Sequence, residues 1–430
     1  MSPGHLVRFD QHPLYALLLL FFGLYPVVSS LVWIATAVLF YLRRERGQGE
    51  AFYDLGDAPP PVSVLIPAFS EEAVIRRTLT GVCALRYPDF EVVVIDDAST
   101  DGTAQLVEEF RLRAESGPAS LPPVRLIQKR TNEGKAMALN DAIPCLRGDL
   151  VLVIDADAYP DPDLLRYLVP HFRSARVGAV TGNPKVANRE TFLAQLQLIE
   201  FTSIVSLLRR AQRIWGRILT MSGVVGLFRK SALFDVGLYA PEMATEDIDI
   251  SWKLQRARYD VRYESRALVW MQVPPTLGRL WKQRMRWARG LSQILRRHRT
   301  VWGDPRDRRL WPVVIEATLS VMWAYCAVLL TVFWIASSAV GHLPRGISPI
   351  PLWWGMLIAT LCIAQLATGV LLERRYDREV VRYFPVAVFY PIVYWMLMAL
   401  VTVLATPFGL LVPSRRGAVT RWQTERDPIT

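Results

Sequence analysis

Long apolar segments stand at both ends of the chain, and short apolar runs alternate with polar residues between them. Leu14 to Leu42 contains no charged residue, and this stretch exceeds the ~20 residues that a helix needs to cross a bilayer. Three further apolar stretches lie near the other end, at residues 312–340, 350–372 and 384–412. The pattern predicts an N-terminal transmembrane segment over residues 1–42 and a C-terminal transmembrane region of about three spans over residues 312–413.

The charges that flank these segments indicate their orientation. Basic residues follow the first span at Arg43–Arg46, and the loop at residues 373–383 carries four arginines. Cytoplasmic loops are enriched in such charges. The tail at residues 414–430 is also basic, which favours the cytoplasm, whereas simple alternation of the spans places it outside. Both placements stay open, because the prolines of the last apolar stretch permit a broken or re-entrant segment. Pro26 likewise allows either one kinked first span or a tight hairpin.

Residues 43–275 show the alternation of strands and helices that is typical of a soluble α/β domain, here expected in the cytoplasm. Each short β-branched run precedes a helical pattern, with strands predicted at residues 62–66, 91–95, 124–128, 150–154 and 177–181. This alternation predicts a mostly parallel, doubly wound sheet with helices on both faces, inserted between the transmembrane helices. Such sheets bind ligands in the crevice at the carboxyl ends of their strands.

The net charge of +11 is concentrated in one segment. Residues 276–309 contain eleven Lys or Arg and two Asp, directly before a long apolar run. We interpret residues 276–311 as basic interfacial helices that meet an anionic membrane surface or a polyanionic substrate. Nucleic acid is not expected as a partner, because no helix-turn-helix, zinc-finger or RNP-type pattern accompanies the charge. The four cysteines form no CxxC pair, which argues against a disulfide framework and a zinc or iron–sulfur site.

Two of the predicted strands end in acidic residues, Asp96-Asp97 and Asp155-Ala156-Asp157. Carboxylates at the end of a buried strand are costly to desolvate unless they meet a cation or hydrogen-bond donors. Each pair alone could simply serve a turn or cap a helix. Together at one sheet edge, with Lys135 following Gly134 at a predicted helix start, they favour a site for a nucleoside diphosphate and a metal. Oxygen ligands and phosphate favour Mg²⁺ or Mn²⁺.

Two further motifs follow the predicted sheet. Thr245 to Asp249 holds three acids, which could form the first turn of a helix capped by Thr245 or could include a general base. Gln283 to Trp287 lies on a basic amphipathic helix, which alone is typical of a membrane surface with Trp281 and Lys282 at the headgroups. Neither motif decides the function by itself.

The order of the four motifs resembles that of the processive inverting glycosyltransferases of family two, which include cellulose, chitin, hyaluronan and poly-N-acetylglucosamine synthases. The resemblance covers the soluble domain and both membrane ends. The bacterial poly-β-1,6-N-acetylglucosamine synthases of biofilm exopolysaccharide look most similar in three segments: VTGNP at 180–184, TEDIDISWKLQ at 245–255 and WKQRMRWARG at 281–290. A cellulose synthase fits less well, because we find no appended cyclic-dinucleotide-binding pattern.

The resemblance implies a GT-A type fold and a role for each motif. It assigns binding of the sugar nucleotide to five residues: Pro67, Glu71, Asp97, Lys135 and Asp155. It assigns the metal to Asp157, and catalysis to Asp247 as the base, together with Glu246 and Arg286. Binding of the diphosphate and the acceptor sugar falls to Gln283, Arg286 and Trp287. Ser70 departs from the family pattern, which commonly has Asn in this loop.

The resemblance also implies a reaction, a location and partners. The expected enzyme polymerises N-acetylglucosamine from UDP-GlcNAc with inversion and exports the growing polysaccharide across the bacterial cytoplasmic (inner) membrane. A small membrane partner subunit is expected, with cyclic di-GMP as an activator at the shared interface. No residue fixes the sugar or the linkage, so a chitin, hyaluronan or cellulose-type synthase stays an alternative. A non-catalytic membrane scaffold, in which the acids are caps and the basic segment is an anchor, is the competing hypothesis.

Overall fold

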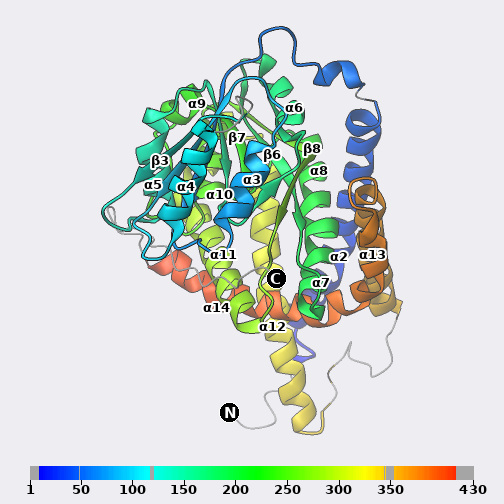
Figure 1. Cartoon of the computed structure of the whole chain (residues 1–430). Helices are drawn as coiled ribbons and strands as arrows, with labels where there is room; N and C mark the ends of the chain where they lie inside the picture. The colour runs from blue at the N-terminus through cyan, green and yellow to red at the C-terminus, as the bar shows by residue number, and fades with distance from the viewer. Residues whose placement is uncertain (1–8, 48, 117–120, 343, 345–352, 413–430) are drawn as a thin grey trace.

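The structure is a computed structural model that describes residues 9–47, 49–116, 121–342, 344 and 353–412. A sheet with helices on both faces forms the centre of the molecule, and the apolar helices run along one flank and beneath it (Figure 1). The basic tail at residues 414–430 and most of the loop around residue 345 lie outside the described residues.

The central sheet has eight strands in the order β3-β2-β1-β4-β7-β6-β8-β5. Their bounds are β1 Val62–Ala68, β2 Phe90–Asp96, β3 Val124–Gln128, β4 Leu150–Ile154, β5 Tyr159–Pro160, β6 Val177–Val186, β7 Val225–Arg229 and β8 Asp260–Met271. The pairs β1–β2, β1–β4, β2–β3 and β6–β8 are parallel, whereas β7 is antiparallel to both of its neighbours and β5 is antiparallel to β8. The prediction of a mostly parallel sheet is therefore confirmed.

Helices cover both faces of this sheet. Val64 and Ile66 of β1 pack in one core with α3, whereas Leu65 between them packs in a second core with α5 and α10. All seven residues of β1 are buried, as expected for a strand covered on both sides. The helices of this domain are α3 Ile75–Cys83, α4 Thr103–Ser116, α5 Gly134–Ala142, α6 Leu164–Leu168, α7 Phe192–Glu200, α8 Ser206–Trp215, α9 Lys230–Asp235, α10 Glu246–Arg256 and α11 Leu277–Arg297.

Three long apolar helices match predicted spans. They are α2 Pro13–Phe40, which a π-helical turn extends to Glu45, α12 Trp311–Ala339 and α13 Trp353–Glu373. Helix α2 continues through Pro26, so the hairpin alternative for the first segment is wrong. Helices α2 and α13 lie side by side along one flank of the sheet domain (Figure 1).

The last apolar stretch is broken, as its prolines permit. It divides into η8 Arg378–Val388, η9 Tyr390–Tyr394 and α14 Trp395–Leu411. Helix α14 has 17 residues, which is shorter than the ~20 needed for a full span. Among the described residues, the fourth helix long and apolar enough to cross a membrane is instead Phe192–Trp215, which comprises α7, a π-helical segment η5 (Phe201–Val205) and α8. Most of that helix is buried inside the protein, against α2 and α13.

Candidate active site

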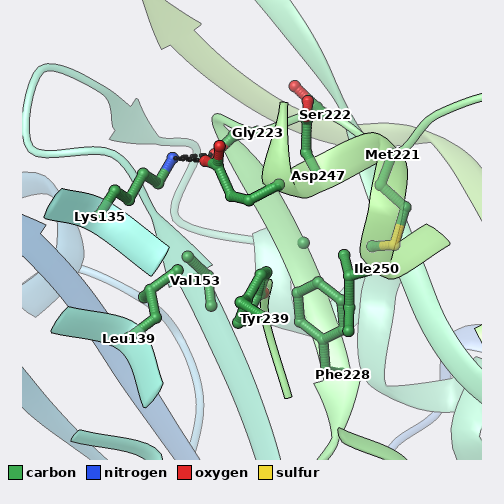
Figure 2. A pocket seen from close by; sticks show the side chains of 12 residues that line it. Lys135, Leu139, Val153, Met221, Ser222, Gly223, Phe228, Tyr239, Asp247 and Ile250 are labelled. Atoms are coloured by element: carbon green, nitrogen blue, oxygen red, sulfur yellow. Dashed lines mark hydrogen bonds and ion pairs between the residues drawn. The ribbon is translucent and has the colours of Figure 1, made fainter. Parts of the chain in front are cut away.

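A cavity with an empty volume of about 290 Å³ lies beside the carboxyl end of β4, between α5 and α10. Its wall is apolar at Leu139 and Phe228, and its charged groups are Lys135, Glu246 and Asp247. Figure 2 shows Lys135 reaching across the cavity toward Gly223, above the apolar residues. An apolar cavity with a few convergent polar groups is the usual form of a ligand site.

Asp247 lies in the first turn of α10, at the rim of the cavity. Its Oδ1 accepts a hydrogen bond of 2.9 Å from the backbone N–H of Ile248. Burial and the neighbouring Glu246 raise the pKa of the Asp247 carboxyl to about 6, although Lys135 and Arg286 oppose this rise. A carboxylate with a pKa closer to neutral is a stronger base than an ordinary aspartate, so Asp247 suits proton abstraction.

Lys135 joins three of the predicted motifs. Its Nζ donates to Asp155 Oδ1 at 2.5 Å and to the carbonyl of Gly223 at 3.1 Å, and lies 3.5 Å from Glu246 Oε1. Burial disfavours the charge of this lysine, but the attraction of Asp155 and Glu246 outweighs burial and raises its pKa. Lys135 therefore stays protonated and is a fixed positive charge at the cavity.

Asp97 serves the loop that presents Lys135. It is fully buried, and its two carboxylate oxygens accept hydrogen bonds from the backbone N–H groups of Glu133 at 3.1 Å and Gly134 at 2.6 Å. Lys129 Nζ lies 3.4 Å from the same carboxylate. Capping was one of the two roles that the sequence left open for Asp97. The structure shows that Asp97 caps the start of α5 and not the turn that directly follows β2. Its contact with the sugar nucleotide stays a prediction.

The first-strand residues lie close to this edge. Pro67 belongs to β1 itself, and Glu71 is fully buried just beyond it, with its backbone N–H donating to Thr103 Oγ1 at 2.8 Å. Ser70 has a φ of +53°, in the left-handed region that Gly and Asn tolerate best. Asn tolerates this conformation better than serine does, so Ser70 adopts it at some cost.

Asp155 and Asp157 follow β4, and both are partly exposed. Within the described ranges, no group of three or more His, Cys, Asp or Glu side chains gathers to hold a metal ion. Asp155 is paired with Lys135, and the carboxylate of Asp157 is an oxygen donor of the kind that divalent cations take.

The Gln283–Trp287 motif on α11 meets the Thr245–Asp247 motif through a close helix contact. A Cβ at Gly290 would lie 2.3 Å from Thr245 Oγ1, so only glycine permits this approach. Gln293 Oε1 accepts from the backbone N–H of Ala244 at 3.1 Å, and the exposed Arg286 donates to the Ala244 carbonyl at 3.3 Å. The two motifs are thus brought together beside the cavity.

The three acids of α10 have different surroundings. Glu246 and Asp247 line the cavity, whereas Asp249 is fully buried on the other side of the helix. Asp249 Oδ1 lies 2.9 Å from His298 Nε2 and 3.2 Å from Arg297 Nε, so it anchors α10 to the end of α11. The sequence pattern did not distinguish these roles, although Asp249 lies two positions from Asp247 and so faces a different side of the helix.

The residues at 221–226 are site residues that the sequence analysis missed. The Gly223 carbonyl accepts from Lys135, and a Cβ at Gly223 would lie 3.2 Å from Asp247 Oδ2. Met221 and Gly226 also line the cavity. The sequence signal that could have identified these residues is the pair Gly223 and Gly226 in a short apolar run. Glycine in a strand is typical of a place that a ligand or another backbone approaches closely.

The acidic residues and Lys135 thus lie at the carboxyl edge of the sheet, where open α/β sheets bind ligands. Residues 59–290 match the family described as "Glycosyltransferase like family 2", and the chain belongs to this family. The chain is 31% identical over 408 residues to a poly-β-1,6-N-acetyl-D-glucosamine synthase of Staphylococcus epidermidis, which covers 93% of this chain and 96% of that protein. A relative of the same name from Staphylococcus aureus strain COL is 32% identical over 411 residues, with the same coverage.

Among solved structures, a mannosyltransferase from Pyrobaculum calidifontis in complex with GDP-Man and Mn²⁺ has a TM-score of 0.61 and 23% identity. The likeness covers 91% of this chain and 98% of that chain and concerns the fold. The predicted family and the GT-A type fold are therefore confirmed. The roles of the individual site residues stay predictions.

Proposed function

We propose that the protein polymerises N-acetylglucosamine from UDP-GlcNAc into a β-1,6-linked polysaccharide, with inversion at the sugar carbon. The support is the similarity to relatives that bear this activity in their names, which extends over nearly the whole length of both chains. The helices outside the sheet domain are thus included in the match. Within the described residues, three apolar helices outside the sheet domain, α2, α12 and α13, are long enough to span a membrane and fit a membrane-bound synthase.

The observation that carries the mechanism is the position of Asp247 at the cavity rim, with its raised pKa of about 6. In the proposed reaction, Asp247 takes the proton of the acceptor hydroxyl as that oxygen attacks the donor sugar. Glu246 holds the pKa of Asp247 up by repulsion. An ordinary aspartate, with a pKa near 3.9, would be a weaker base.

The leaving UDP needs positive charge on the other side of the sugar. Lys135, the fixed positive charge at the cavity, would supply it. Arg286, with Gln283 beside it on α11, would bind the same diphosphate. A divalent metal held by Asp157, Mg²⁺ or Mn²⁺, would add charge that stabilises the leaving diphosphate. We assign Pro67, Glu71, Asp97 and Asp155 to the edge that holds the nucleotide.

Synthesis and export are proposed to be one process in the bacterial inner membrane. Helix α11, which carries the Gln283–Trp287 motif, packs against α14, and a Cβ at Gly409 of α14 would lie 2.5 Å from the Arg289 carbonyl. The acceptor end of the polymer would thus lie beside the apolar region over residues 312–413. Residues 1–42 and this region form the proposed membrane part, residues 43–275 the cytoplasmic catalytic domain, and residues 276–311 the interfacial helices.

Partners are proposed from resemblance. A small membrane subunit and cyclic di-GMP at its interface with this chain would regulate the synthase. The described residues contribute no contact that bears on either partner. Copurification of the chain with its membrane partners, with and without the dinucleotide, is the measurement that addresses them.

A panel of radiolabelled nucleotide sugars tests the reaction. Membranes with the protein should incorporate UDP-GlcNAc into a polymer, and linkage analysis should give β-1,6 bonds. Incorporation of UDP-glucose, or β-1,4 linkages, would instead indicate a cellulose, chitin or hyaluronan type of product. No incorporation from any donor would contradict the proposal and favour the scaffold hypothesis.

A further inference from the structure

The indole of Trp287 is covered on one face by an arginine that lies outside the recognised positions of its motif. The guanidinium of Arg284 lies 4.2 Å from the centre of the Trp287 ring. Arg284 is only 2% exposed, whereas Trp287 is partly exposed. A cation at this distance is attracted by the ring electrons and leaves no room for another group on the same face.

Arg284 is itself held by two buried side chains from other elements. Its Nη2 donates to Glu200 Oε2 of α7 at 2.6 Å, and the hydroxyl of Tyr394 in η9 donates to the same oxygen at 2.8 Å. The Arg284 guanidinium also lies 5.9 Å from the Tyr394 ring, which is stacked on Tyr390 with centroids 5.0 Å apart. Glu200 and Tyr394 are 7% and 1% exposed.

These contacts fix the orientation of the guanidinium. A buried ion pair contributes little net stability, but removal of one partner leaves a buried charge without compensation. Nε of Arg284 has no hydrogen-bond partner among the described residues, so the hydrogen bond to Glu200 and the two aromatic rings define its position. The cluster joins the sheet domain through α7, the motif helix α11, and η9 of the apolar region.

We propose that Arg284, held by Glu200 and Tyr394, is a positioning residue that covers one face of Trp287 and leaves only the opposite face to stack on the acceptor sugar. This inference rests on the proposed function, in which Trp287 binds the acceptor. Aromatic faces stack on the apolar faces of sugar rings, and a single open face admits the growing chain from one side. The terminal sugar is thereby oriented in each cycle.

The test uses the full chain in vesicles and measures the KM for GlcNAc oligomer acceptors, the KM for UDP-GlcNAc and the length of the products. The variants are Tyr394→Phe, which removes one hydroxyl, Glu200→Gln and Arg284→Met. We expect the acceptor KM to rise by about threefold in Tyr394→Phe and by about tenfold in Arg284→Met. The donor KM should stay within about twofold, since its site is assigned elsewhere, and the products should become shorter.

Arg296→Met is the matched control, because Arg296 is an exposed arginine on the same helix with no contact to the cluster. Arg284→Lys keeps a charge beside Glu200 but loses the planar group, so its acceptor KM should lie between those of wild type and Arg284→Met. Equal rises in both KM values, or an unchanged acceptor KM in Tyr394→Phe and Glu200→Gln, would overturn the inference. If the wild-type protein fails to extend GlcNAc oligomers, the proposed function itself is wrong.

Discussion

Asp247 depends on the charges around it for its chemistry. Burial and Glu246 raise its pKa to about 6, and Lys135 and Arg286 lower it. Since Asp247 must be ionised to accept a proton, kcat/KM for the acceptor should rise as pH increases through about 6 and fall below that pH. A pH profile with UDP-GlcNAc incorporation measures this midpoint. A rate independent of pH between 5 and 8 would contradict the assignment of the base.

The Lys135→Met variant tests how the pKa of Asp247 depends on the neighbouring positive charge. Removal of the positive charge leaves Asp247 and Glu246 with less compensation, so the pKa of Asp247 should increase and the midpoint should move to higher pH. The donor affinity should fall as well, because the lysine is assigned to the diphosphate. A midpoint that moves to lower pH would exclude this electrostatic coupling.

Part of the site could be predicted from the sequence because the acids that follow β2 and β4, the two strands that flank β1, lie at the same edge of a parallel sheet. Asp155 and Lys135 do meet there, as the motif order suggested. The separate roles of Asp97 and Asp249 could not be predicted, because capping and ion pairing depend on which backbone groups and side chains the fold brings near. The cluster around Arg284 required contacts across about 190 residues of sequence, between Glu200 and Tyr394, and local patterns carry no such information.

At the scale of elements, the contact between α10 and α11 assembles the site. Gly290→Ala would place a methyl group 2.3 Å from Thr245 Oγ1, so the helices must separate. We expect a loss of stability of about 1–3 kcal/mol, typical of overpacking, and at least a tenfold loss of activity, because Arg286 and Trp287 would move relative to Asp247. Thermal unfolding and polymer synthesis measure the two effects.

Gly278→Ala is the matched control on the same helix. No atom lies within 4 Å of a Cβ at that position, so the substitution should be neutral or stabilising by up to about 1 kcal/mol. Equal losses in Gly278→Ala and Gly290→Ala would show that the effect comes from helix composition rather than from the contact with Thr245.

The elements that the sequence predicted well are those with strong local periodicity. The first four strands and β6 begin within one residue of their predicted positions. β7 escaped prediction because it is short and contains glycine. β8 escaped prediction because charged residues occupy both buried and partly buried positions along it. Composition is less informative for the helix at Phe192–Trp215. This helix is long and apolar enough to cross a membrane, yet most of it is buried in the protein, and composition alone cannot distinguish the two cases.

At the scale of the whole molecule, a buried group of charges ties the apolar helices to the sheet domain. Glu373 at the end of α13 is fully buried and interacts with Lys185 of β6 and Arg210 of α8. Arg210 Nε also pairs with Glu45, just beyond α2, at 2.6 Å. The two positive charges of Lys185 and Arg210 are therefore neutralised by the two negative charges of Glu373 and Glu45.

Glu373→Gln tests the importance of this balance. The variant leaves two buried cations facing one carboxylate, and we expect a loss of stability of about 3–5 kcal/mol. Glu379→Gln is the control, because the Glu379 side chain is 65% exposed and lies 3.5 Å from Arg189, which keeps its closer pair with Asp377 at 2.6 Å. A loss below about 1 kcal/mol is expected for this variant. Unfolding of both variants in detergent measures the difference. Similar stability of the two would show that the buried charges do not hold the domain to the apolar helices.

The proposal that this membrane-bound glycosyltransferase polymerises GlcNAc with Asp247 as the base leads to one decisive comparison. Wild type and Asp247→Asn are measured side by side in vesicles for polymer synthesis from labelled UDP-GlcNAc and by calorimetry for UDP binding in the presence of Mg²⁺ or Mn²⁺. We expect the variant to lose polymer synthesis by at least about 10²-fold, with UDP affinity within about threefold of wild type, because the residues assigned to the nucleotide are unchanged. Polymer synthesis at the wild-type rate by Asp247→Asn would contradict the mechanism.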